Sequence, residues 1–440
     1  MTCIGTKLQQ AGYATHMVGK WHCGLATNTH TPHGRGYNTS LNYFDAANDY
    51  WTSQFSSCLD KTTSLPTLTD LWDTTHPAIG SNNSWACSQA NQAKDCIWED
   101  DRLQARLLST IDAHDPTTPL FLFWSAHTVH EPYEVPDADL ARFAHIDVKV
   151  RKFYASMVSH LDGLVPAVVG ALKAKGMWEN TLWITTSDNG GPLSRMQPGD
   201  SLDNVAGANN YPLRGGKIGV LEGGIRLNAF VSGGFIPQHM RGSSVEAFMH
   251  LCDWYTTFCA LAGADPYDHQ AADAGLPPVD GLDMSPVIMG VNTSSPRHEI
   301  VIGSSDNTDH LGNTIVAGII DSDGWKLLIE SRVSPAFWQG DVYPNSSSAA
   351  GTQAMPNKVL CGDPQASGDD KGPGCLFNVL TDPSEYHDLA LQHPDIVTRL
   401  RTRIAEHQST VYSPDRGTHD RDMCLTGLDR HNGFLGPWLP

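Results

Sequence analysis

Three apolar runs, separated by segments with helical spacing, constrain the fold of this chain more than any other feature. They read PLFLFWSA at 119–126, TLWITTSDNGG at 181–191, which ends in a polar turn, and RLNAFVSGG at 226–234. Apolar runs of this length predict buried strands. Helices are predicted at 101–114 and at 151–176, where Gly176 is the stop signal. Buried strands that alternate with helices predict an α/β fold with a mixed, mostly parallel sheet flanked by helices.

The N-terminal quarter of the chain is less regular. A short helix from Lys7 to Ala11 and a strand from Thr15 to Val18 are predicted at its start. Residues 26–100 are rich in Asn, Thr, Ser and Asp, with scattered aromatic residues. We therefore expect a loop-heavy insertion in this stretch.

The pattern changes after about residue 296. The runs EIVIGSS, TIVAGIIDSDGWKLLIE and CLFNVLTD predict antiparallel strands, with a hairpin turn at Asp321–Gly324 and a helix from about Asp395 to His407. Residues 344–374 read as a loop. We therefore divide the chain into a main domain at 1–295 and a smaller C-terminal antiparallel α+β subdomain at 296–440.

Composition argues against several classes of function. The formal net charge is -19, from 29 basic and 48 acidic residues, which argues against a broad basic face for nucleic acid. No run of about eighteen apolar residues exists, so no membrane span is expected. The first twenty residues also lack the apolar core of a signal peptide. The sequence does not predict an oligomeric state.

Ten cysteines and four N-x-S/T sequons, at Asn38, Asn82, Asn292 and Asn345, favour a secreted or lysosomal-like secretory compartment. Free buried cysteines and chance sequons are the alternative. Cys361 and Cys375 enclose a loop rich in Gly, Asp and Pro, and we predict that they pair. Cys252 and Cys259 lie about two helical turns apart, which is too far for a bond between them.

Polar residues follow three of the predicted strands at the sheet edge where ligands collect in open α/β sheets. They are Lys20 and His22 after the first strand, His127 and His130 after the second, and Asp188 and Asn189 after the third, followed by Arg214, Lys217 and Glu222 in the segment PLRGGKIGVLEGGIR. Oxygen ligands beside cations and imidazoles suit an anion held against a hard divalent metal. Each piece alone is weak, because Asp-Asn-Gly-Gly is usually a plain turn and a Gly-rich segment is usually a loop.

The joint order of these motifs is more specific. The runs are AGYATHMVGKWHCG, FLFWSAHTVHEPYEVP, TTSDNGG, NNYPLRGGKIGVLEGGIR, MHLCDWYTTFCALAG and CLFNVLTDPSEYHDLA. Together they resemble the type I sulfatases of the alkaline phosphatase superfamily, from about residue 7 to residue 391. The arylsulfatase B group, which acts on N-acetylgalactosamine 4-sulfate, is the most similar.

This resemblance implies roles for individual residues. Lys20 would bind both the sulfate and the nucleophile, His22 would hydrogen-bond the nucleophile, and His130 would face the leaving oxygen. Lys217 would be the second sulfate-binding lysine. Asp188 and Asn189 would be calcium ligands, and His127 matches no functional position. The implied substrate is a sulfated carbohydrate or an aryl sulfate.

Two elements of the family pattern are missing from the sequence. No C/S-x-P-S-R run, the source of the formylglycine nucleophile, occurs among the 440 residues. The first core strand, with two metal-binding aspartates, is also absent. We therefore expect an N-terminally truncated sulfatase with an incomplete site for one Ca²⁺.

Two further interpretations stay open. The first is a non-catalytic pseudo-sulfatase that binds sulfated glycans. The second is a phosphodiesterase or phosphomutase of the same superfamily. The second is disfavoured because Asn189 stands where a histidine ligand for a second metal would be expected.

Overall fold

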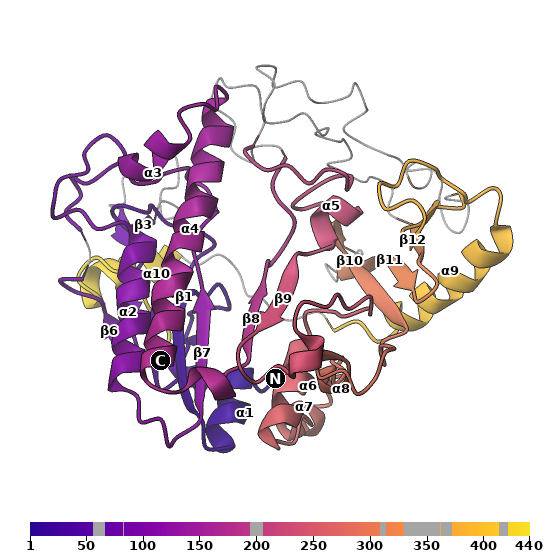
Figure 1. Ribbon diagram of the computed structural model, residues 1–440, viewed down its shortest axis with the longest axis horizontal. Helices are drawn as coiled ribbons and strands as arrows, with labels where there is room; N and C mark the ends of the chain where they lie inside the picture. The colour runs from indigo at the N-terminus through magenta and orange to yellow at the C-terminus, as the bar shows by residue number, and fades with distance from the viewer. Residues whose placement is uncertain are drawn as a thin grey trace.

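The computed structural model describes residues 1–55, 67–81, 83–193, 206–308, 314–329, 361, 372–412 and 421–440, without the side chains of 304–308, 314, 315 and 421. Figure 1 shows the N-terminal sheet and its helices on one side of the molecule and the C-terminal sheet with α9 on the other. Strands β8 and β9 lie between them. The predicted α/β class with a mixed sheet is confirmed.

The N-terminal sheet has five strands in the order β6-β5-β2-β1-β7. These are β6 (His76–Pro77), β5 (Trp72–Asp73), β2 (Thr39–Tyr43), β1 (Ala14–Lys20) and β7 (Leu120–Ser125). β2, β1 and β7 run parallel, while β5 and β6 are antiparallel additions. The loop-heavy insertion predicted at 26–100 therefore contains a core strand, β2. Its sequence TSLNY is short and polar, so it gave no apolar signal.

Helices pack against this sheet through apolar side chains at helical spacing. They are α1 (Ile4–Gln10), α2 (Glu99–Ala113) and α4 (Lys149–Ala174), while α3 (Asp137–Arg142) packs against α4. One core cluster joins Val18 and Leu41 of the strands to Leu107 of α2 and Val168 of α4. The helices predicted at 101–114 and 151–176 are confirmed, with each start two residues earlier.

Strands β8 (Trp183–Thr186) and β9 (Ala229–Ser232) pair with each other antiparallel and form a sheet of their own. Within the described ranges, neither pairs with β7. Phe123 of β7 is therefore 41% exposed and Phe230 of β9 is 59% exposed. The prediction that these runs are fully buried is wrong, because burial depends on a neighbouring strand at each edge. Trp183 still packs against the same core cluster as Trp124 of β7.

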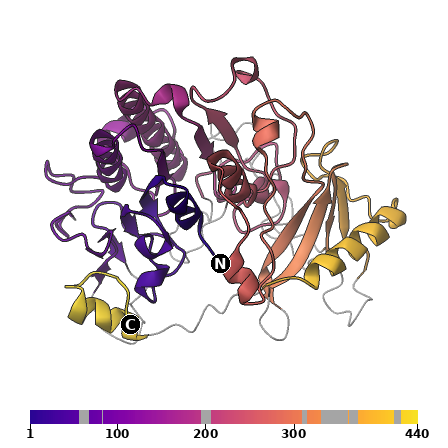
Figure 2. The same ribbon diagram turned by 90° about the horizontal axis from the view of Figure 1, so that it is seen from below.

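The C-terminal sheet matches its sequence pattern closely. Its order is β10 (Glu299–Thr308), β11 (Thr314–Asp321), β12 (Trp325–Leu328) and β13 (Cys375–Asn378), all antiparallel. The hairpin turn is confirmed, since the N–H of Gly324 donates to the carbonyl oxygen of Asp321 at 2.9 Å. Helix α9 (Pro394–Gln408) packs along this sheet, as Figure 2 shows.

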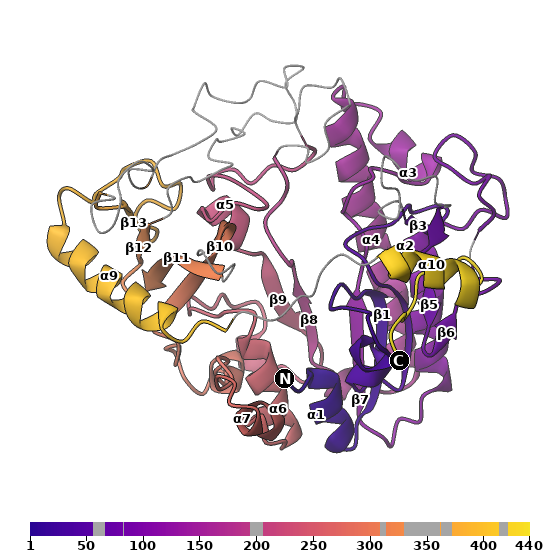
Figure 3. The ribbon, with the colours of Figure 1, turned by 180° about the vertical axis from the view of Figure 1, so that it is seen from behind.

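The remaining helices are α5 (Glu222–Ile225), α6 (Asp253–Ala262), α7 (His269–Asp273), α8 (Ser285–Ile288) and α10 (Arg421–Arg430), and the pair β3 (Gln54–Phe55) and β4 (Leu68–Thr69) forms a small sheet. The chain returns at its end to the N-terminal sheet, where Phe434 joins the core cluster of Val18 and Leu41 and also bridges Thr69 of β4. Figure 3 shows α10 on that side of the molecule. The proposed boundary at 296 thus separates the two sheets, while residues 421–440 pack against the first. Of the loop predicted at 344–374, only Cys361 and residues 372–374 lie within the described residues.

Two disulfides join described cysteines. The predicted bond between Cys361 and Cys375 is confirmed, and a second joins Cys87 and Cys96, for which the sequence gave no signal. Cys252 and Cys259 are free, in agreement with the prediction that they do not bond.

One described helix, α4, is long and apolar enough to cross a membrane by length and composition alone. Its Leu164, Val168 and Leu172 are buried within the protein. A core helix of a globular domain satisfies the same test.

Candidate active site

The first part of the site lies at the end of β1. Lys20 is the last residue of the strand and is half-buried. It follows Gly19, where a side-chain carbon would lie 1.8 Å from the carbonyl oxygen of Ser125, so only glycine lets β1 approach β7 this closely. His22 is exposed, and its backbone N–H donates to the carbonyl oxygen of Phe44 at 3.1 Å.

The second part is the turn after β7, residues 127–130. His127 is buried at 2% exposure, and its Nδ1 lies 2.7 Å from Oε2 of Glu99. His130 is half-buried, and its Nδ1 lies 2.8 Å from the carbonyl oxygen of Glu131. The two histidines therefore differ in surroundings: one is held inside the protein, and the other is partly open.

The third part is the turn after β8 and the glycine-rich segment that returns to it. Asp188 is exposed and Asn189 is half-buried. The N–H of Lys217 donates to the carbonyl oxygen of Gly191 at 3.1 Å, which anchors the lysine beside this turn. A side-chain carbon on Gly190 would lie 1.8 Å from the carbonyl oxygen of Gly223, so the contact between the two segments requires glycine.

Electrostatic effects show that these three parts lie within reach of one another. Burial lowers the pKa of Lys20, the charge of Lys217 lowers it further, and Asp188 and Asp45 act in the opposite direction. Burial lowers the pKa of His130 to about 4, and the charges of Lys217 and Lys20 contribute to that shift. Neighbouring cations suit an anionic ligand, because a bound anion would relieve their mutual repulsion.

His22 belongs to the same group. Desolvation lowers the pKa of His22, and the charges of Lys20 and Lys217 lower it further, while Asp45 raises it. Asp45 was not among the residues predicted from the sequence. It lies two residues after the end of β2, so recognition of that strand would have placed it at the same sheet edge.

Arg214 and Glu222 have structural contacts instead. The guanidinium of Arg214 donates to the carbonyl oxygen of Glu385 at 2.9 Å, and Glu222 accepts from Nζ of Lys326 at 3.0 Å. All four residues are buried. These contacts tie the glycine-rich segment to the C-terminal sheet and leave Lys217 as the cation of this segment near the strand ends.

The chain's own described residues do not make a complete metal site. Within the described ranges, no group of three or more His, Cys, Asp and Glu side chains could hold an ion. Asp188 and Asn189 offer oxygen atoms, but Ca²⁺ takes six to eight oxygen ligands. The predicted calcium ligands are therefore insufficient by themselves.

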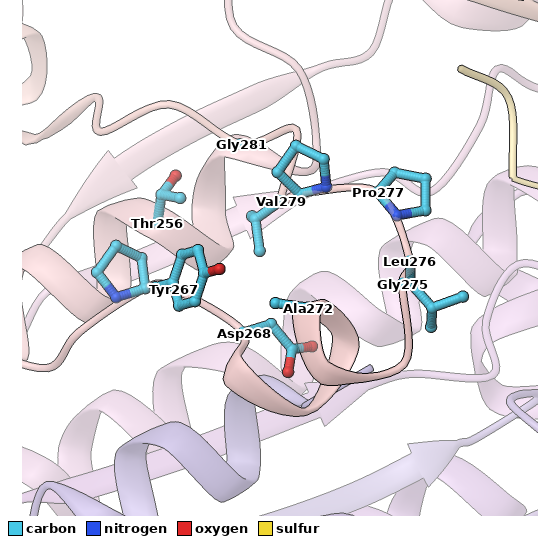
Figure 4. Close-up of a pocket in the computed structure, with 11 residues that line it drawn as sticks. Thr256, Tyr267, Asp268, Ala272, Gly275, Leu276, Pro277, Val279 and Gly281 are labelled. Atoms are coloured by element: carbon cyan, nitrogen blue, oxygen red, sulfur yellow. The ribbon is translucent and has the colours of Figure 1, made fainter. Parts of the chain in front are cut away.

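A pocket of about 470 Å³ lies elsewhere, between α6, α7 and the proline-rich loop at 276–281 (Figure 4). Among the described residues that line it, Asp268 is the charged one, and it accepts hydrogen bonds from the N–H and hydroxyl of Thr2. The pocket does not contain any of the predicted site residues.

Comparisons with known proteins place the chain in a family. A family model described as Sulfatase matches residues 1–264. The chain is 30% identical to arylsulfatase J of Mus musculus, over 98% of this chain and 66% of that protein. It is 26% identical to N-acetylgalactosamine-6-sulfatase of Mus musculus, over 92% of this chain and 68% of that protein.

The chain covers only part of its relatives. It spans 66% of arylsulfatase J and 49% of steryl-sulfatase of Rattus norvegicus, to which it is 26% identical. Among solved structures, it is similar to Ps i-CgsB, with a TM-score of 0.67 and 24% identity over 98% of this chain and 80% of that one. It is also similar to the PsFucS1 sulfatase from Pseudoalteromonas sp., with a TM-score of 0.62 and 20% identity over 92% and 72%. These likenesses concern the fold.

Proposed function

This chain belongs to the sulfatase family, and from that premise we propose that it is the core of a sulfuric ester hydrolase. The substrate would be the sulfate ester of a sugar or of an aryl group. The observation that carries the proposal is that Lys20, Lys217 and His130, from the ends of β1 and β7 and the segment after β8, lie within electrostatic reach of one another.

Each proposed role follows from the charge that develops on a sulfate ester. Lys20 and Lys217 would stabilise negative charge on the sulfuryl oxygens. His130, whose pKa of about 4 is held down by burial and by the lysine charges, would gain a proton as a bound anion offsets those charges and would then donate it to the leaving oxygen. His22 would hydrogen-bond the nucleophile. Asp188 and Asn189 would contribute two ligands to a Ca²⁺ site that the described residues do not complete.

The nucleophile limits what the 440 residues would do. Sulfatases use a formylglycine, and no C/S-x-P-S-R run occurs in this sequence. Loss of a covalent nucleophile usually costs several orders of magnitude in rate even where the binding groups remain. We therefore expect these residues to bind a sulfate ester without useful turnover. That is also the behaviour of the alternative, a pseudo-sulfatase for sulfated glycans.

A secretory compartment is proposed together with this function. Disulfides at Cys87–Cys96 and Cys361–Cys375 fit an oxidising compartment, and the sequon residue Asn292 is exposed.

Two relatives are named as an arylsulfatase and as an N-acetylgalactosamine-6-sulfatase. Both names fit a sulfate ester as substrate.

The test is a calorimetric titration of the 440-residue chain with inorganic sulfate and with an aryl sulfate. Replacing Lys20 or Lys217 by Gln should weaken binding by about fivefold or more, since each removes one ion pair of about 1 kcal/mol. Lys173→Gln, at an exposed position on α4, is the matched control and should bind normally. Equal binding by all variants would reject the site.

An aryl-sulfate turnover assay with Ca²⁺ present completes the test. The chain alone should show no useful rate. Robust turnover would mean that the nucleophile lies somewhere else in these residues.

A further inference from the structure

A stack of three aromatic rings lies directly beneath the turn that carries His130. The ring of Tyr50 is sandwiched between Trp98, at 4.9 Å between ring centres, and His127, at 3.8 Å, and both pairs are nearly parallel. Tyr50 is 0% exposed. It comes from the irregular segment after β2, so the stack links that segment to the start of α2 and to the end of β7.

The hydroxyl group of Tyr50 reaches both ends of the turn. It lies 3.0 Å from the carbonyl oxygen of His127 and 3.0 Å from that of His130, and it donates its single proton between them. The N–H of His130 closes the turn by donating to the carbonyl oxygen of His127 at 3.1 Å. One buried hydroxyl therefore fixes the spacing of the two ends.

Other buried groups hold the first half of the turn. The carboxylate of Asp100 accepts from the N–H groups of His127 and Thr128, each at 3.2 Å, and from the hydroxyl of Thr128 at 2.5 Å. Glu99 holds the imidazole of His127. At the second half, the hydroxyl of Tyr50 is the side-chain group that bonds the backbone of His130.

We propose that Tyr50 is a positioning residue, whose hydroxyl holds the His130 imidazole beside Lys20 and Lys217. The role assigned to His130 in catalysis rests on the proposed function, but the positioning itself does not. Without the hydroxyl, His130 would keep its backbone bond to His127 but lose its link to the buried aromatic stack, so the ring would shift toward solvent and away from the two lysines.

Tyr43 provides a matched control. It is also 0% exposed, and its ring lies 4.8 Å from that of the same His127. Its hydroxyl has no hydrogen-bond partner among the described residues. Tyr43→Phe and Tyr50→Phe therefore remove the same atom at the same depth, and only Tyr50→Phe breaks contacts to the turn.

The experiment is an NMR titration of His130 in the 440-residue chain with labelled histidine, and it requires no sulfatase activity. Burial and the lysine charges together hold the pKa of His130 down to about 4. Both causes weaken if the ring moves outward, so Tyr50→Phe should raise this pKa by about one unit toward its ordinary value. Tyr43→Phe should leave it unchanged. An unchanged His130 titration in folded Tyr50→Phe would overturn the proposal.

A second measurement uses the unaltered chain, so it tests the proposal even if Tyr50→Phe does not fold. The hydroxyl proton of Tyr50 should exchange with solvent far more slowly than that of Tyr211, whose side chain is 47% exposed. Isotope shifts on the tyrosine ring carbons report this rate. Exchange of Tyr50 as fast as that of Tyr211 would show that the hydroxyl does not close the turn.

Discussion

Each half of the molecule buries a cluster of charged side chains, and the two clusters are built differently. In the lysine cluster, Nζ of Lys326 lies 3.0 Å from Glu222 and 2.8 Å from Glu385, all of them buried. The acid cluster contains Asp70, Glu99 and Asp100 with His127, all of them buried. Its carboxylates are held by amide, hydroxyl and imidazole groups.

The difference lies in what neutralises the carboxylates. Burial alone would lower the pKa of Lys326, but Glu385 and Glu222 raise it, so the lysine stays charged. In the acid cluster, burial raises the pKa of Asp70 and of Glu99 to about 7. The lysine cluster is therefore a permanent ionic bond between the two halves. The acid cluster, beneath the turn that carries His130, changes its charge near neutral pH.

The largest expected effect comes from the lysine cluster. Lys326→Ala leaves two buried carboxylates without a cation, which should lower the free energy of unfolding by about 4 kcal/mol. Arg399→Ala is the control, because Arg399 pairs with Asp321 at a half-exposed position and should cost less than about 1 kcal/mol. Urea unfolding measures both. Similar costs for the two variants would mean that the lysine cluster is hydrated and is not a buried ionic bond.

Each cluster also has a disulfide beside it, and these bonds come next in size. Cys361–Cys375 shares a core with Val220 and Leu221, which precede Glu222, while Cys87–Cys96 packs with Trp98 beside Glu99. Replacing either pair by serines should cost about 3 kcal/mol by the loop-closure estimate. Calorimetry of both double variants measures these costs. If the two halves unfolded in separate transitions, the lysine cluster would not link them.

The acid cluster gives an effect of a different kind, because its size depends on pH. The unfolded carboxyl of Glu99 loses its proton near pH 4.5, whereas the folded one keeps it until about pH 7. The folded state thus binds more protons in this window, so the contribution of Glu99 falls as pH rises from 4.5 to 7. Glu99→Gln should remove that decline, which amounts to at most about 1.4 kcal/mol per pH unit.

Unfolding curves at several pH values between 4.5 and 7 measure this effect. Burial lowers the pKa of His127 to about 3, so the contribution of His127 to the free energy of unfolding rises between pH 3 and 6.5, opposite to that of Glu99. The effect of Glu99 is therefore the difference between the curves of the variant and the parent. Lys173→Gln, at an exposed position on α4 outside the acid cluster, serves as the control. Parallel curves for the parent and Glu99→Gln would show that Glu99 does not change its charge in this window.

The sequence was a sound guide where the signal was local. The antiparallel strands after residue 296, the turn at Asp321–Gly324 and the helix near 395–407 all follow from neighbouring residues, and all were predicted. The candidate residues Lys20, His130 and Lys217 also follow short motifs, and the structure brings them within electrostatic reach.

What the sequence did not predict depends on partners far along the chain. Lys326 in an apolar strand would normally be taken for a surface residue, and its partner Glu222 lies 104 residues away. Tyr50 and Asp45 stand in a stretch that reads as a plain loop, since β2 before them is short and polar. The exposure of β7 and β9 was missed because apolar residues reveal a tendency to be buried and do not show whether a neighbouring strand is available to cover them.

The unpaired edges of β7 and β8 have a consequence for the life of this polypeptide in a cell. Within the described residues, each presents backbone groups without a strand partner, next to the exposed rings of Phe123 and Phe230. Such edges are templates for pairing with any extended chain, including a second copy. These edges therefore offer the 440-residue chain a route to self-association at high concentration, whereas the strands of the C-terminal sheet pair with one another.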